Sequence, residues 1–161
     1  MARIYAEVYG CPTNIADYEI CIGALKGSGF DIVDSLQGSD LNIIFTCIVK
    51  TPTEKRMIRK IQELTRTGKP LIVAGCMTKT SQRTIARINP DASILGPDSI
   101  GHIVEAVNAS LDGKRVVFVK DEREPKVGKR VRKKSSVGIV PISAGCMSNC
   151  AYCAVKFARG R

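Results

Sequence analysis

The stretch Leu41-Asn42-Ile43-Ile44-Phe45-Thr46-Cys47 is the clearest indication of fold class in this sequence. Its first six residues form a mostly apolar, partly β-branched run of the length of a strand. Such a run is typical of a strand that is buried on both faces of a parallel sheet. We therefore expect a strand over residues 41–46, with Cys47 directly after its end.

Comparable runs recur on both sides of this stretch, separated by helical patterns. Strands are expected over residues 4–9, 30–33, 71–74, 93–95 and 116–119, and helices over residues 14–26, 51–64, 81–88 and 100–111. Regular alternation of strands and helices favours a parallel sheet with helices on both faces. The predicted fold class is thus α/β, a doubly wound parallel sheet of the Rossmann or flavodoxin kind.

Local signals mark where two of these helices begin. Asn14 is a typical N-cap residue, and Asp17 would then lie in the first turn, where a carboxylate favours the positive end of a helix. Thr51-Pro52-Thr53-Glu54 has the pattern of a capping box with proline at the first helical position.

The chain divides into three predicted segments. Residues 1–120 form the α/β domain, residues 121–136 a polar and basic linker, and residues 137–161 the start of a second domain. Val137–Ser143 is expected to be the first strand of that second domain, because it resumes an apolar pattern.

Charge is concentrated near the C-terminus. The net charge is +10, and the residues after Glu124 include nine basic residues and no acidic one, with six basic residues in Lys126–Lys134. Such a stretch is expected to be exposed and mobile. It favours a polyanionic partner, with RNA the leading candidate, and the alternative is a solvated linker kept soluble by its charge.

Several function classes lack support in the sequence. No apolar run approaches the roughly 20 residues that span a bilayer, and the N-terminus lacks a signal-peptide pattern, so we expect a cytoplasmic protein without a membrane partner. The seven cysteines are an odd number, and disulfides are not expected in that compartment. No Walker loop, paired catalytic carboxylates or Ser/His/Asp set appears, and no catalytic side chain is assigned.

The strongest chemical signal is a C-x3-C-x2-C array formed by Cys146, Cys150 and Cys153. Three thiolates on one short loop can hold three irons of a [4Fe–4S] cluster and leave the fourth iron open for a ligand. A zinc site is the alternative, but it requires a fourth protein ligand, and no His or Cys follows.

Three further cysteines lie at predicted strand ends. Cys11, Cys47 and Cys76 follow the strands that start near residues 4, 41 and 71. Parallel strands bring their carboxyl ends to one edge of the sheet, where ligands bind, so these cysteines could hold a second cluster. The alternative is three buried structural cysteines. Cys21 is interpreted as a core residue, and His102 as a surface residue.

These motifs together resemble the methylthiotransferase family of radical S-adenosylmethionine (SAM) enzymes. The resemblance covers the whole chain and rests on the three-cysteine array and on residues 10–14, 46–47 and 73–77. Residues 49–54 look most like the archaeal and eukaryotic branch. That branch acts on N6-threonylcarbamoyladenosine at position 37 of tRNA.

The resemblance implies roles for the cysteines. Cys146, Cys150 and Cys153 would hold the SAM-cleaving [4Fe–4S] cluster on the cluster loop of a radical SAM barrel. Cys11, Cys47 and Cys76 would hold an auxiliary [4Fe–4S] cluster that supplies or relays sulfur.

The resemblance also implies the reaction and its partners. Tyr152 would lie beside the SAM adenine. One SAM would methylate sulfur, and a second would yield the radical that abstracts hydrogen from C2 of the adenine. The implied partners are tRNA, SAM and an electron donor, with no DNA.

Two features depart from the family pattern. Phe45 stands where the family usually has asparagine. The chain ends eight residues after Cys153, so most of the barrel and an RNA-binding domain are expected to be missing, and these residues alone are not expected to turn over. The alternatives are a sister methylthiotransferase that acts on isopentenyladenosine in tRNA or on a ribosomal protein, and a non-catalytic iron–sulfur module.

Overall fold

The computed structural model describes residues 1–48, 51–119, 126, 128–133 and 136–160. At its centre is one sheet of six parallel strands in the order β2-β1-β3-β4-β5-β6. The strands are β1 (Arg3–Val8), β2 (Asp31–Val33), β3 (Leu41–Thr46), β4 (Leu71–Gly75), β5 (Ser93–Leu95) and β6 (Val117–Phe118). The strand order reverses between β1 and β3, as in flavodoxin-like sheets.

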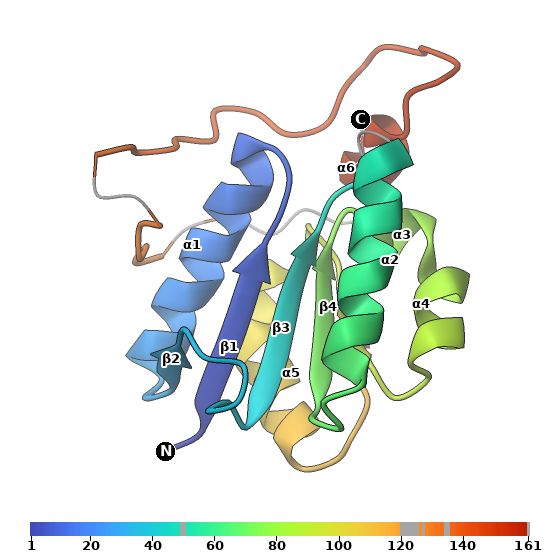
Figure 1. The fold of residues 1–161 in the computed structure, drawn as a ribbon. Helices are drawn as coiled ribbons and strands as arrows, with labels where there is room; N and C mark the ends of the chain where they lie inside the picture. Colours follow the sequence, from blue (N-terminus) through green and yellow to red (C-terminus); the bar gives the residue numbers. More distant parts are fainter. Residues whose placement is uncertain (49–50, 120–125, 127, 134–135, 161) are drawn as a thin grey trace.

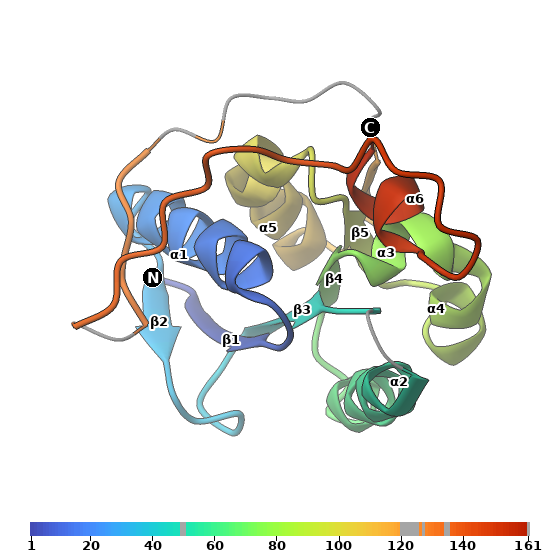
Figure 2. The ribbon, with the colours of Figure 1, turned by 90° about the horizontal axis from the view of Figure 1, so that it is seen from above.

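Helices cover both faces of this sheet (Figure 1). They are α1 (Pro12–Gly27), α2 (Thr51–Thr65), α3 (Met77–Thr80), α4 (Gln82–Ile88), the 3₁₀ turn η1 (Ile100–His102), α5 (Ile103–Leu111) and α6 (Val155–Arg159). Seen from above, α1 and α5 lie on one face, and α2 and α4 on the other (Figure 2).

The core has two layers because successive side chains of the central strands point to opposite faces. Ile43 and Phe45 of β3 pack with α1 and α5, whereas Ile44 packs with Met57 and Ile61 of α2. Every residue of β3 and β4 is buried. The sequence-based prediction of a doubly wound α/β sheet is thereby confirmed.

Most predicted elements are found within one or two residues of their predicted bounds. The short helix α3 was not predicted, because four residues are too few for a periodic pattern. Helix α2 begins at Thr51 itself. The predicted capping box involves Thr51 and Pro52, whose side chains lie outside the described residues.

Asn14 does not cap α1. The helix is preceded by Cys11 at the N-cap position, with Pro12 as its first residue. The Asn14 side chain instead donates hydrogen bonds to the Tyr9 and Thr46 carbonyl oxygens, at 2.6 and 3.3 Å. Its amide therefore ties the segments that follow β1 and β3 to each other.

The prediction of a strand over Val137–Ser143 is wrong. These residues have no regular secondary structure, and no strand of the described chain pairs with them. Val140 and Ile142 are 77% and 93% exposed. A β-strand needs a hydrogen-bonding neighbour, so an apolar pattern without one remains extended chain.

Residues 128–133 lie along α1, and residues 136–154 cross above the carboxyl ends of the strands to reach α6 (Figures 1 and 2). The division into domains at residues 120 and 136 stays a prediction, and residues 121–125, 127 and 134–135 of the linker lie outside the described residues. No helix in the described part of the chain is long and apolar enough to cross a membrane.

Candidate functional site

Three cysteines lie where three neighbouring strands end. Cys47 directly follows β3, Cys76 directly follows β4, and Cys11 comes three residues after β1. The register pairs Val8 with Phe45 and Thr46 with Gly75, so the three strands end side by side. The predicted placement of these cysteines at one edge of the sheet is therefore found.

Two glycines shape the turns that lead to these cysteines. Gly10 and Gly75 have φ angles of +107° and +90°, a region that favours glycine. A Cβ atom on Gly10 would lie 2.5 Å from Cβ of Cys47, and one on Gly75 would lie 2.5 Å from the Thr46 carbonyl oxygen. Glycine at both positions thus permits a sharp turn. It also lets the segment after β1 approach Cys47, and the end of β4 approach Thr46.

A cavity of about 270 Å³ opens at this edge of the sheet. Its walls come from both ends of the chain and include Cys11, Cys76, Gly145 and Arg159. The Arg159 side chain lies against Cys76, with Nε donating a hydrogen bond to Sγ at 3.2 Å. The cavity is thus lined by thiols from the sheet edge and by residues that flank the second cysteine group.

Cys47 and Cys76 are buried, and Cys11 is partly exposed. Burial raises the pKa of the Cys76 thiol, and the Arg159 guanidinium lowers it by charge and by hydrogen bonding. Cys47 and Cys11 raise the same pKa by smaller amounts. Burial is the largest effect, so the pKa of Cys76 lies above its ordinary value.

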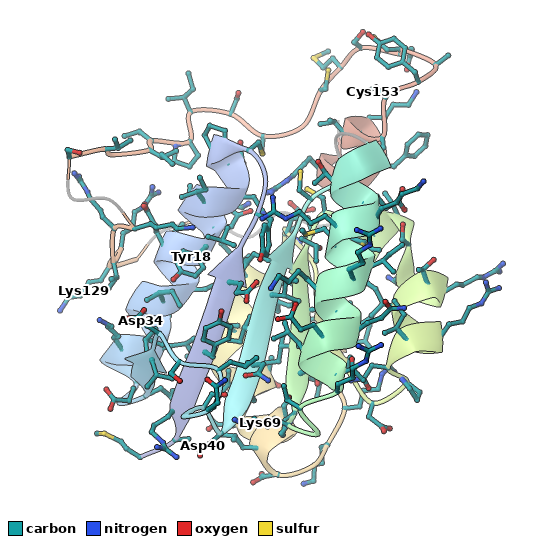
Figure 3. All side chains as sticks on the ribbon, viewed as in Figure 1. Tyr18, Asp34, Asp40, Lys69, Lys129 and Cys153 are labelled. Carbon is teal, nitrogen blue, oxygen red and sulfur yellow. The ribbon has the colours of Figure 1, made fainter. Side chains whose placement is uncertain are left out.

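The second cysteine group lies on the loop above this edge. Cys146 and Cys150 are exposed. Cys153 is partly exposed and is labelled in Figure 3. The loop is closed by a hydrogen bond from the Cys146 amide to the Gly160 carbonyl oxygen at 3.1 Å. Tyr152 is 92% exposed and faces solvent.

Both cysteine groups have the donor chemistry that an iron–sulfur cluster requires, because each offers three thiols and cysteine thiolates are the ligands of such clusters. Among the described residues, no three His, Cys, Asp or Glu side chains are arranged to hold a single metal ion. A cluster differs from a single ion because each cysteine binds a different iron. Each thiol set therefore has the donors that a cluster would need.

The remaining cysteine, Cys21, lies in the core between α1 and η1, as expected. It is fully buried, and its Sγ lies 3.8 Å from the Ile100 carbonyl oxygen. Burial raises its pKa well above the ordinary value, which keeps the thiol neutral.

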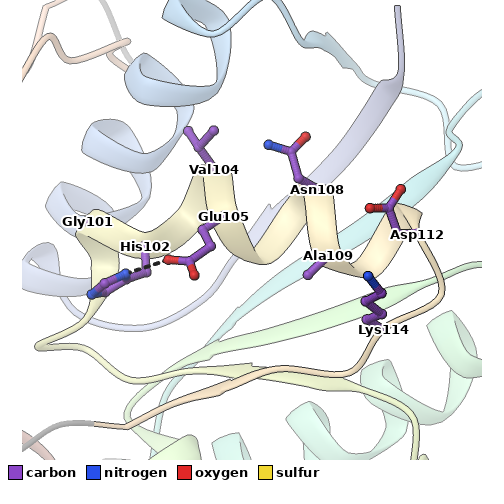
Figure 4. A pocket seen from close by; sticks show the side chains of 8 residues that line it. All are labelled: Gly101, His102, Val104, Glu105, Asn108, Ala109, Asp112 and Lys114. Carbon is purple, nitrogen blue, oxygen red and sulfur yellow. Dashed lines mark hydrogen bonds and ion pairs between the residues drawn. The ribbon is translucent and has the colours of Figure 1, made fainter.

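His102 lies in a separate surface depression of about 580 Å³ along α5 (Figure 4). Its Nδ1 lies 2.9 Å from a Glu105 carboxylate oxygen, and its ring stacks on Phe118. These contacts agree with the expectation of a surface residue.

The basic segment is not freely exposed along its described part. Lys126 forms a 2.7 Å ion pair with Asp17, and the amides of Val131 and Lys133 donate to the Glu19 carbonyl and carboxylate. The expected exposure is therefore found only in part. Asp17 and Glu19, two buried acidic residues of α1, provide partners that a charge count along the chain does not show. The expected mobility of the segment stays a prediction. Lys134 lies outside the described residues.

Some basic side chains of this segment nevertheless face solvent. Lys129, Arg132 and Lys133 are exposed, and Figure 3 shows Lys129 pointing away from the sheet.

Two residues of the site were missed or misassigned from the sequence. Asp17 does not serve the helix dipole: it is 1% exposed and pairs with Lys126 and Arg159. Most of the buried residues of α1 are apolar, so an acidic residue among them indicates that a cation is buried beside it. Nothing local could identify that partner as Arg159, which is 142 residues away.

Phe45, where the resemblance leads one to expect asparagine, is fully buried and meets the Tyr18 ring edge-on at 5.5 Å. Asn14 provides polar contacts at this strand end, through the Tyr9 and Thr46 carbonyl oxygens. The departure from the family pattern therefore leaves the cysteines in place.

Comparisons with known proteins connect this site to one family. Residues 3–96 match the model of a family described as uncharacterized protein family UPF0004. The chain is 37% identical over 170 residues to a probable threonylcarbamoyladenosine tRNA methylthiotransferase of Pyrococcus horikoshii, and 39% identical over 163 residues to one of Methanothermobacter thermautotrophicus. It is 32% identical over 165 residues to the ribosomal protein uS12 methylthiotransferase RimO of Desulforamulus reducens.

These alignments cover 99%, 99% and 94% of the chain. The chain spans 38% of the length of the two archaeal relatives and 36% of the bacterial one.

Proposed function

Because the chain belongs to the UPF0004 family, whose model matches residues 3–96, we propose that it provides the cysteine sites of a tRNA methylthiotransferase. The proposed reaction adds a methylthio group to C2 of N6-threonylcarbamoyladenosine at position 37 of tRNA, by radical SAM chemistry. Among the relatives, the archaeal proteins named for this nucleoside are 37% and 39% identical, against 32% for the ribosomal-protein enzyme.

One observation supports the proposal above the others. Cys11, Cys47 and Cys76 follow three adjacent parallel strands, and the loop of Cys146, Cys150 and Cys153 lies over the same edge. A reaction that uses one cluster to make a radical and another to provide sulfur needs both near one substrate. The chain offers two thiol sets on one side of the molecule.

In this proposal each set of three cysteines holds a [4Fe–4S] cluster. When bound, the clusters supply reductive SAM cleavage at one site and sulfur at the other. The chain's own residues orient and shield them. Gly10 and Gly75 let the strand ends turn toward the cavity, and the Arg159 guanidinium donates a hydrogen bond to the sulfur of Cys76. Tyr152, exposed on the loop, is proposed to contact the adenine of SAM.

The other proposed properties follow from this reaction. The partners are tRNA, SAM and an electron donor, and the compartment is the cytoplasm. The exposed cations of the basic segment are proposed to contact tRNA phosphates, which would give affinity without sequence specificity.

We predict that deleting the gene in its source organism abolishes the 2-methylthio derivative of N6-threonylcarbamoyladenosine in tRNA, with the unmethylthiolated nucleoside accumulating. Mass spectrometry of tRNA nucleosides and of ribosomal protein uS12 measures this. The gene with Cys21→Ala should restore the derivative, and the gene with Cys76→Ala should not. Loss confined to the isopentenyladenosine derivative or to uS12 would identify a sister enzyme, and no loss in any of them would refute the proposal.

We predict that Cys47→Ala and Cys150→Ala each lower the iron bound after anaerobic reconstitution, because each cysteine is a ligand of a different cluster. The loss should approach about four irons per chain, one cluster's content. Cys21→Ala is the control, since its thiol is buried in the core, and it should retain the wild-type iron content. Equal iron in all four proteins would show that these thiols are structural.

We predict that changing Lys129, Arg132 and Lys133 to serine weakens tRNA binding and flattens its salt dependence. Each lost phosphate contact should lower the slope of log affinity against log salt by about 0.7–0.9. Fluorescence anisotropy with labelled tRNA measures the slope, and Lys114→Ser, an exposed cation beyond α5, is the control. An unchanged slope in the triple variant would leave the segment as a structural tether.

A further inference from the structure

Asp17 of α1 is a buried carboxylate that receives cations from two distant parts of the chain. It is 1% exposed, and its two oxygens pair separately with Lys126 and Arg159. A buried carboxylate is costly unless it is paired and hydrogen-bonded. The two ion pairs to Asp17 therefore hold Lys126 and Arg159 against α1.

Arg159 connects that carboxylate to the cysteine site. It is 5% exposed, and each of its three guanidinium nitrogens has a partner. Nη1 donates to Asp17, Nη2 to the Asn14 side-chain oxygen at 3.4 Å, and Nε to Cys76 Sγ at 3.2 Å. The planar guanidinium suits this role, because its donors point in fixed and different directions, which a lysine ammonium cannot reproduce.

The same residue also fixes the second cysteine loop. Arg159 ends α6, which packs against α3, the helix that directly follows Cys76. Its neighbour Ala158 is fully buried. The next residue, Gly160, accepts the hydrogen bond from the Cys146 amide that closes the loop. Anchoring Arg159 thus anchors both ends of the Cys146–Cys153 loop.

We propose that Arg159 is a positioning residue that holds the loop of Cys146, Cys150 and Cys153 over the edge formed by Cys11, Cys47 and Cys76, with Asp17 as its anchor. It also shields the Cys76 sulfur from solvent. The inference goes beyond the proposed function and uses it only in assigning the cysteines as cluster ligands. The contacts themselves are made by the protein alone, so they can be tested without iron.

The test uses the metal-free, reduced 161-residue chain under anaerobic conditions. Two rates are measured by mass spectrometry: amide hydrogen exchange of residues 144–160, and alkylation of Cys76 by iodoacetamide. In Arg159→Gln both should rise more than about tenfold, because a buried ion pair is broken and the loop opens. Exchange of β3 amides should remain at the wild-type rate, which shows that the sheet is still folded.

Lys156→Gln is the matched control, since it removes the same charge from the same helix and its ammonium lies over the Phe157 ring. It should leave both rates unchanged. Equal rates in Arg159→Gln and Lys156→Gln would overturn the proposal.

Arg159→Lys separates the two contacts if the glutamine variant fails to fold. Lysine keeps a cation for Asp17 but cannot also reach Cys76 and Asn14, so Cys76 alkylation should rise more than exchange of the loop. Wild-type alkylation in the folded lysine variant would overturn the proposal. Neither result depends on iron content or on tRNA nucleosides, so this inference and the proposed function fail separately.

Discussion

The in-register parallel pairing of β1, β3 and β4 sets the positions of the cysteines, the cavity and the covering helices. Parallel strands all end at the same edge, and the register places Thr46 opposite Gly75. Cysteines that are 36 and 29 residues apart in sequence are thereby brought to adjacent strand ends. A slip by one residue would turn the side chains of a central strand to the other face, and both core layers oppose such a slip.

The buried carboxylate of Asp17 is a second constraint on the structure, in addition to the pairing of the strands. An unpaired Asp17 carboxylate inside the molecule would cost on the order of several kcal/mol, so the cations of the C-terminal segment stabilise α1 in its place. Asn14, one turn before Asp17, contributes to the same network by linking the Tyr9 and Thr46 carbonyls. One helix thus organises the strand ends, the cysteine cavity and the returning chain.

Periodicity was sufficient for the sheet, because β3 and β4 are apolar runs of strand length and the intervening helices carry clear patterns. Periodicity failed to predict the structure where contacts between distant parts of the chain determine it. Asn14 has a strong local preference for capping, yet two carbonyl acceptors at the strand ends outweigh it. Val137–Ser143 has a strand's composition but no neighbour to pair with. The partners of Asp17 could not be read from the sequence, because both lie more than 100 residues away.

The proposal that Cys11, Cys47 and Cys76 hold one cluster at the carboxyl edge of the sheet can be tested by anomalous diffraction. Data are collected at the iron edge from crystals of the anaerobically reconstituted chain. We expect an iron peak in contact with these three sulfurs, separate from a second peak at Cys146, Cys150 and Cys153. Iron found only at the loop, with the three edge cysteines as free thiols, would contradict it.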